Sequence, residues 1–156
     1  MHQKIEKIKK NETKPFIIKS ILNKKQIKTI QNLYKILPIE INNTRQKIIK
    51  KKWITKFNPN LQEIIKKKIK KKIGSFKLDN PKNKNGLNSF GLFQESYKPV
   101  SLHADTGFDF KKIIFKQFLF PLSSKGETVI FKNRFYGCST TFSIDPKELK
   151  AKGLSL

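Results

Sequence analysis

The fold is decided by the stretch IIFKQFLFPLSSKGETVIFKNRF, residues 113–135. It contains two runs rich in β-branched and aromatic residues, 113–122 and 127–135, on either side of the connection Ser-Ser-Lys-Gly at 123–126. Runs of this kind around a short Gly-containing connection predict a β-hairpin. Both alternating faces of the first run are largely apolar, which is typical of a strand between two layers. A further short strand is expected at 140–144.

The chain before residue 79 carries helical patterns instead. One set of apolar residues follows Asn23, which suits an N-cap, and a second follows Asn58-Pro59 and ends at Gly74. The two sets are Ile27, Ile30, Leu33, Tyr34 and Leu37, and Leu61, Ile64, Ile65, Ile69 and Ile73. Ile49, Trp53 and Phe57 lie at steps of four, which we also interpret as helical. Residues 15–22 are interpreted as a short strand and 79–89 as a loop.

The order of these patterns predicts a β-sandwich or barrel with helices packed outside it. A length of 156 residues suits one domain. We expect residues 1–14 to be a flexible basic tail and residues 15–156 to be the single domain. Within it, 15–78 would be mainly helical support and 90–156 the strands.

The chain is strongly basic, with a formal net charge of +24. Its 35 basic residues include only two arginines, Arg45 and Arg134, although Arg is the better ligand for phosphates and base edges. Residues 1–85 have a net charge of +20 and residues 86–156 one of +4. Lys, Ile, Asn and Phe are in excess together, as in proteins of AT-rich genomes. We therefore attribute the charge to codon bias, and a nucleic-acid partner would be bound without sequence preference.

The sequence also bears on location. The longest apolar run, 118–122, is far shorter than the roughly 20 residues that a membrane-spanning helix needs. The first fourteen residues lack the apolar segment of a secretory signal, and the single cysteine, Cys138, fits a reducing compartment. We expect a cytoplasmic protein without a membrane partner.

His103 and Asp105 form the candidate motif for chemistry. Side chains at positions i and i+2 of a strand point to the same face, so this imidazole and this carboxylate can converge on one metal ion. Such a pair suits Fe(II), Mn or Zn, and a second His would complete a facial triad.

The residues around this motif resemble the iron(II)- and 2-oxoglutarate-dependent oxygenase superfamily. The resemblance covers about residues 90–144 and is carried by QESYKPVSLHADTG (94–107), IFKQFLFPL (114–122) and GETVIF (126–131). It implies an α+β fold, with N-terminal helices packed on a partial double-stranded β-helix, or jelly roll. It also implies Fe(II) held by His103 and Asp105, 2-oxoglutarate as cosubstrate, and hydroxylation of a C–H bond in a small-molecule or protein substrate.

One part of the family pattern is missing. Family members carry a second ligand His well downstream, followed by an Arg that pairs with the far carboxylate of 2-oxoglutarate. No His follows Asp105 here, and the other histidine, His2, lies in the expected tail. The chain is therefore interpreted as a truncated or degenerate member. With two protein ligands, it is expected to bind Fe(II) poorly and to turn over 2-oxoglutarate slowly or not at all.

Three further residues are candidates for cofactor binding. Lys116 could pair with the cosubstrate carboxylate, as a Lys on a nearby strand does in some family members, and Arg134 is one of only two arginines. Tyr97 could donate a hydrogen bond to the cosubstrate. Each residue also has an ordinary explanation: Lys116 could be a surface lysine, Arg134 a member of an ion pair, and Tyr97 a core residue.

Two other classes of protein compete with an oxygenase. One is a basic nucleic-acid-binding module that uses residues 1–85, and the other is a metal-free jelly-roll binding protein. A nucleic-acid binder would interleave Arg and exposed aromatics in its basic stripe, whereas here the apolar residues follow core-facing periods. Neither alternative explains His103 and Asp105.

Overall fold

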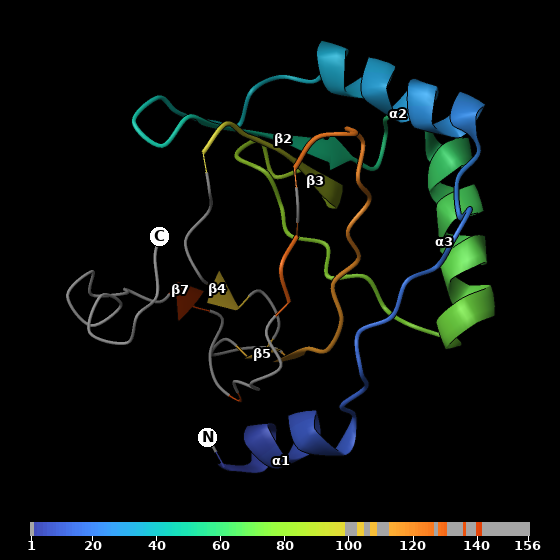
Figure 1. The fold of residues 1–156 in the computed structure, drawn as a ribbon, viewed down its shortest axis with the longest axis vertical. Helices are drawn as coiled ribbons and strands as arrows, with labels where there is room; N and C mark the ends of the chain where they lie inside the picture. Colours follow the sequence, from blue (N-terminus) through green and yellow to red (C-terminus); the bar gives the residue numbers. More distant parts are fainter. Residues whose placement is uncertain are drawn as a thin grey trace. The chain divides into compact units, whose positions relative to one another are not determined.

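The computed structural model describes residues 2–98, 103–104, 107–108, 113–126, 128–130, 136 and 140–141. The chain divides into two compact units, residues 16–99 and residues 1–15 with 100–156. Helices and antiparallel strands are both present (Figure 1), which confirms the α+β class.

In the unit of residues 16–99, α2 (Lys24–Ile36) begins at the predicted N-cap. The Asn23 side chain accepts a hydrogen bond from the Gln26 backbone N–H at 2.8 Å, and the Gln26 side chain accepts one from the Asn23 N–H at 3.0 Å. This capping box satisfies two N–H groups that the first turn leaves without helical partners.

The second predicted helix is α3 (Pro59–Ile73). The Asn58 side chain accepts a hydrogen bond from the Leu61 N–H at 3.2 Å, and Pro59 occupies the first turn, where a missing N–H costs nothing. The helix ends at Gly74, whose φ of +81° carries the chain away from the helix axis. Figure 1 shows α2 and α3 next to each other, beside β2 and β3.

Three strands form an antiparallel sheet in the order β1-β2-β3: β1 (Ile41–Asn43), β2 (Ile48–Ile54) and β3 (Ser89–Ser96). Lys51 lies opposite Phe93, and the register shifts after Trp53. Residues 74–88 connect α3 to β3 and include the predicted loop except for Ser89, which begins β3; the connection turns at Gly86, whose φ is +76°.

β2 corrects the helical interpretation of Ile49, Trp53 and Phe57. The first two lie in the strand, and Phe57 follows it in a turn that the Trp53 indole N–H closes by donating to the Phe57 carbonyl. A step of four residues is a multiple of the strand period of two, so residues four apart share a face in either conformation. The spacing alone could therefore not distinguish a helix from a strand.

The strand predicted at 15–22 is also wrong. This segment forms no strand, and Phe16 and Ile17 are 57% and 88% exposed. Because no strand pairs with this segment, its apolar side chains do not pack on the face of a sheet.

The core of this unit lies between the two helices and the sheet. Its buried apolar residues are Ile30, Leu33, Leu37, Trp53, Ile54, Leu61, Ile65 and Ile69. Aromatic rings extend it, since Trp53 meets Phe90 edge-on at 4.8 Å between ring centroids and Tyr34 meets Phe93 at 5.6 Å. Burial of these side chains is the main stabilising contribution.

The other unit begins with α1 (His2–Lys10), where the sequence predicted a flexible tail. Lys7, Lys9 and Lys10 lie in its last turn, where positive charge interacts favourably with the helix dipole. Lys9 also forms an ion pair with Glu6 at 3.2 Å. These local interactions favour the helix, in which the two isoleucines, Ile5 and Ile8, lie three residues apart on one face.

The strands of this unit are short and antiparallel. β4 (His103–Ala104) pairs with β7 (Thr140–Thr141), and β5 (Gly107–Phe108) pairs with β6 (Ile113–Ile114). Of the strand predicted at 113–122, only the first two residues form a strand in the structure. Phe115 and Leu119, 42% and 58% exposed, are not covered by layers on both sides.

The remaining strand predictions fall largely beyond what the structure describes. Residues 128–130 form no strand, while 127 and 131–135 lie outside the described residues. The run at 140–144 contains β7, and 142–144 are again outside. No helix in the described ranges is long and apolar enough to cross a membrane.

Candidate functional site

His103 is the first residue of β4 and lies opposite Thr141 of β7. Its side chain is exposed, so the imidazole is accessible from solvent. The strand conformation is the one that the His-x-Asp spacing requires for two converging side chains. This part of the motif has the expected local structure.

The second half of the motif, Asp105, lies outside the described residues, as does Arg134. Within the described ranges, no three His, Cys, Asp or Glu side chains are close enough together to hold a metal ion. His2, the other histidine of the sequence, lies on α1 with an exposed side chain.

Lys116 follows β6 in a segment without strand structure. Its side chain is exposed, and its ammonium donates a hydrogen bond to the Thr13 hydroxyl at 2.5 Å. Both residues belong to the same unit as His103. The ammonium is accessible to an anion, since its partner here is a neutral hydroxyl.

Tyr97 belongs to the other unit and is 64% exposed. Its hydroxyl donates to one carboxylate oxygen of Glu95, and this hydrogen bond raises the pKa of Tyr97 above its ordinary value of 10.0. Tyr97 is therefore not a core residue. Its hydroxyl would have to break the hydrogen bond to Glu95 before it could donate to a cosubstrate.

The structure brings together a polar cluster that the sequence did not indicate. Tyr34 donates to the second carboxylate oxygen of Glu95, and the ammonium of Lys51 lies 4.3 Å from the centre of the Tyr34 ring. The same ammonium donates to the Tyr34 carbonyl at 2.8 Å, although Lys51 is only 9% exposed. Tyr97 completes this cluster, which links α2 to β2 and β3.

Burial, followed by the hydrogen bond to Glu95, raises the pKa of Tyr34 to about 12. The pKa of Glu95 is lowered, first by the Tyr34 hydrogen bond and then by that of Tyr97. Neither group is poised to exchange protons near neutral pH, so the cluster is suited to binding helix to sheet rather than to acid–base catalysis. Tyr34 and Glu95 are far apart in the sequence, and no spacing rule could have paired them.

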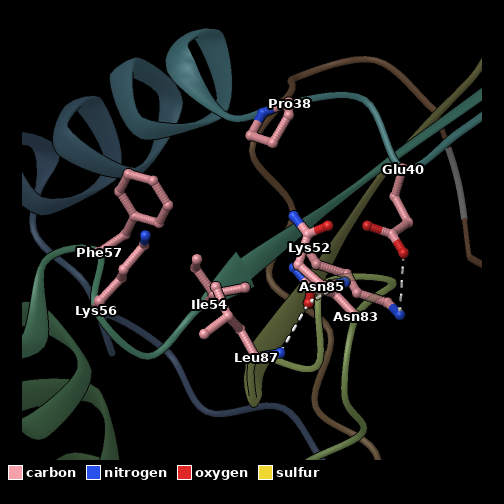
Figure 2. Close-up of a pocket in the computed structure, with 9 residues that line it drawn as sticks. All are labelled: Pro38, Glu40, Lys52, Ile54, Lys56, Phe57, Asn83, Asn85 and Leu87. Carbon is pink, nitrogen blue, oxygen red and sulfur yellow. Dashed lines mark hydrogen bonds and ion pairs between the residues drawn. The ribbon is translucent and has the colours of Figure 1, made fainter.

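A small pocket of about 130 Å³ opens beside Ile54 (Figure 2). Glu40 and Lys52 lie on its wall as an ion pair at 3.6 Å. The Asn83 side chain accepts hydrogen bonds from the backbone N–H groups of Asn85 and Leu87 at 3.0 and 2.9 Å. None of the nine residues drawn carries a hydroxyl, thiol or imidazole group, and Glu40 and Lys52 are paired with each other, so we assign no reaction to this pocket.

Comparison with known proteins found no match. No protein-family model, no curated protein and no solved structure matches this chain.

Proposed function

We propose that this chain is an Fe(II)- and 2-oxoglutarate-dependent oxygenase-like protein that hydroxylates a substrate C–H bond. The observation that carries the proposal is the exposed imidazole of His103 on an antiparallel strand, with an aspartate two residues further along. Imidazole and carboxylate are the donors that a non-haem Fe(II) site uses. The family-like residues at 94–131 support the same class.

The finer fold in this proposal is a partial double-stranded β-helix. It is supported by two antiparallel pairings. β4 pairs with β7, which is far from it in the sequence, and β5 pairs with β6, which follows it closely. Long-range antiparallel pairing of this kind is characteristic of jelly rolls.

In the proposed site, His103 and Asp105 would hold the metal. When bound, Fe(II) with 2-oxoglutarate supplies an oxidising system: O₂ is reduced as 2-oxoglutarate is converted to succinate and CO₂, and one oxygen atom enters the substrate C–H bond. The protein's part is to hold the ion, bind the cosubstrate carboxylate and orient the substrate. Lys116 is the proposed carboxylate partner, because its exposed ammonium lies in the same unit as His103. Tyr97 and Arg134 remain secondary candidates.

Succinate release from 2-oxoglutarate tests this proposal. With two protein donors the activity of the chain should be low, and added imidazole should raise it by supplying the missing nitrogen ligand. We expect His103→Ala to lower the imidazole-stimulated rate by about tenfold or more. His2→Ala is the matched control, since it removes the other histidine of the sequence, and should leave the rate unchanged.

The proposal fails if imidazole does not stimulate succinate release, or if His103→Ala and His2→Ala have equal effects. Circular dichroism of both variants would establish that each is folded.

A further inference from the structure

The unit of residues 16–99 carries most of the charge of the chain. It contains 21 basic and four acidic residues, a net charge of +17. Several of its lysines gather on α3, whose apolar residues Leu61, Ile65 and Ile69 are 3–5% exposed and face the core. The polar side of this helix is therefore fixed toward solvent.

Three exposed lysines, Lys67, Lys70 and Lys71, lie on that solvent side, and we call them the lysine face. Lys70 and Lys71 follow Lys67 by three and four residues, so each of them is a neighbour of Lys67 on the helix surface. The other lysines of the helix centre have partners: Lys66 pairs with Glu63 at 2.6 Å, and Lys68 donates to the Ile21 carbonyl at 2.6 Å. Among the described residues, no acidic group lies within ion-pair distance of the lysine face.

The arrangement is electrostatically unfavourable for the isolated unit. Like charges three or four residues apart destabilise a helix by roughly 0.2–0.5 kcal/mol per pair. The helix dipole offsets part of this for Lys70 and Lys71 near the C-terminus, but not for Lys67, which lies in the third turn. A polyanion across this face would remove the repulsion.

We propose that the lysine face binds the phosphate backbone of double-stranded nucleic acid, without sequence preference. Lysine is a compact, strongly hydrated point charge, which suits phosphate contacts rather than readout of base edges. A single strand would call for exposed aromatic side chains, and α3 has none. An anionic membrane would call for several exposed apolar side chains to insert, yet three of the five on α3 are buried, Ile73 is half-buried and only Ile64 is exposed, at 40%.

Titration of a labelled 20-base-pair duplex at several salt concentrations tests the proposal. We expect weaker binding by the triple variant Lys67→Gln, Lys70→Gln, Lys71→Gln. The slope of log K against log[salt] should fall in magnitude by about 0.9 for each phosphate that the variant no longer neutralises, or by up to about 3 in all. Gln is a good helix former, so the fold should survive, as thermal unfolding would verify.

The matched control replaces three exposed lysines elsewhere in the same unit, Lys47, Lys84 and Lys98, with Gln. It removes the same net charge and should keep most of the affinity and the slope. Equal losses in both variants would show that overall charge alone attracts the duplex and would overturn the proposal. Absence of duplex binding, a clear sequence preference, or tighter binding to vesicles containing phosphatidylserine would overturn it as well.

Discussion

Glu95 is held by two phenol hydroxyls, one from a helix and one from its own strand end. Tyr34 contributes the hydrogen bond that reaches across from α2 to β3, while Tyr97 lies only two residues from Glu95. The Tyr34 ring is partly buried against Phe93, whereas Tyr97 is largely exposed. The two hydrogen bonds should therefore contribute unequally to stability.

We expect Tyr34→Phe to lower the free energy of unfolding by about 1 kcal/mol, because a partly buried hydrogen bond to a carboxylate is removed while the ring remains. Tyr97→Phe removes the same kind of group at an exposed position and should have a smaller effect. Urea denaturation of both variants measures the difference. A larger decrease for Tyr97→Phe would contradict this assignment.

The lowered pKa of Glu95 makes a prediction about acid stability. A carboxyl whose folded pKa lies below its ordinary value of 4.5 stabilises the fold above about pH 4.5, and this contribution disappears as the pH falls through the folded pKa. The stability difference between the native chain and Glu95→Gln should thus be constant from pH 7 to 5 and shrink below pH 4.5. A difference that does not change with pH would contradict it.

Residue-scale detail was the least accessible to sequence reasoning. Tyr34 was predicted on the core-facing side of a helix, which agrees with its packing, but its partner Glu95 had no assigned role. Burial of Lys51 could not be foreseen in a chain so rich in exposed lysine, because it depends on a carbonyl and a ring supplied by α2.

At the scale of elements, α3 depends on its C-terminal glycine. Gly74 has φ +81° and ψ −165°, a region that other residues rarely adopt. Gly74→Ala should therefore destabilise the protein by about 1–3 kcal/mol. Gly91→Ala is the control, since this strand residue has ordinary φ and a Cβ there would meet nothing within 4 Å. Thermal unfolding of the two variants should separate them, and equal melting temperatures would contradict the assignment.

Helices α2 and α3 were predictable because independent signals agreed, whereas α1 was not predicted. At both helices the apolar period and an N-cap Asn indicated the same start, and at α3 Gly74 indicated the end. At β2 the only signal was a step of four residues, which suits a helix and a strand equally. Its assignment as a strand depends on pairing with β1 and β3, which the local sequence does not encode.

At the scale of the whole molecule, uncompensated positive charge should limit stability. Three ion pairs join described residues to one another, against a formal net charge of +24. Raising NaCl from about 10 mM to about 150 mM shortens the Debye length from about 30 to about 8 Å and screens this repulsion. The melting temperature should rise, and should rise less for the triple variant of the lysine face. A fall in melting temperature would show that attractive pairs dominate.

The candidate site was predictable only in part. The sequence identified His103 on a strand, and the structure places it at the start of β4. Its strand partner β7 comes from the far end of the chain, and pairing over such a separation is set by the tertiary fold rather than by local pattern.

Binding of Mn(II), an air-stable substitute for Fe(II), tests the central claim most directly. Electron paramagnetic resonance of free Mn(II), with and without 2-oxoglutarate, gives the affinity of the native chain, His103→Ala and His2→Ala. The native chain and His2→Ala should bind one equivalent weakly, more tightly with 2-oxoglutarate, and His103→Ala should bind at least about tenfold more weakly. Equal binding by all three, or binding that 2-oxoglutarate does not strengthen, would contradict a metal site at His103.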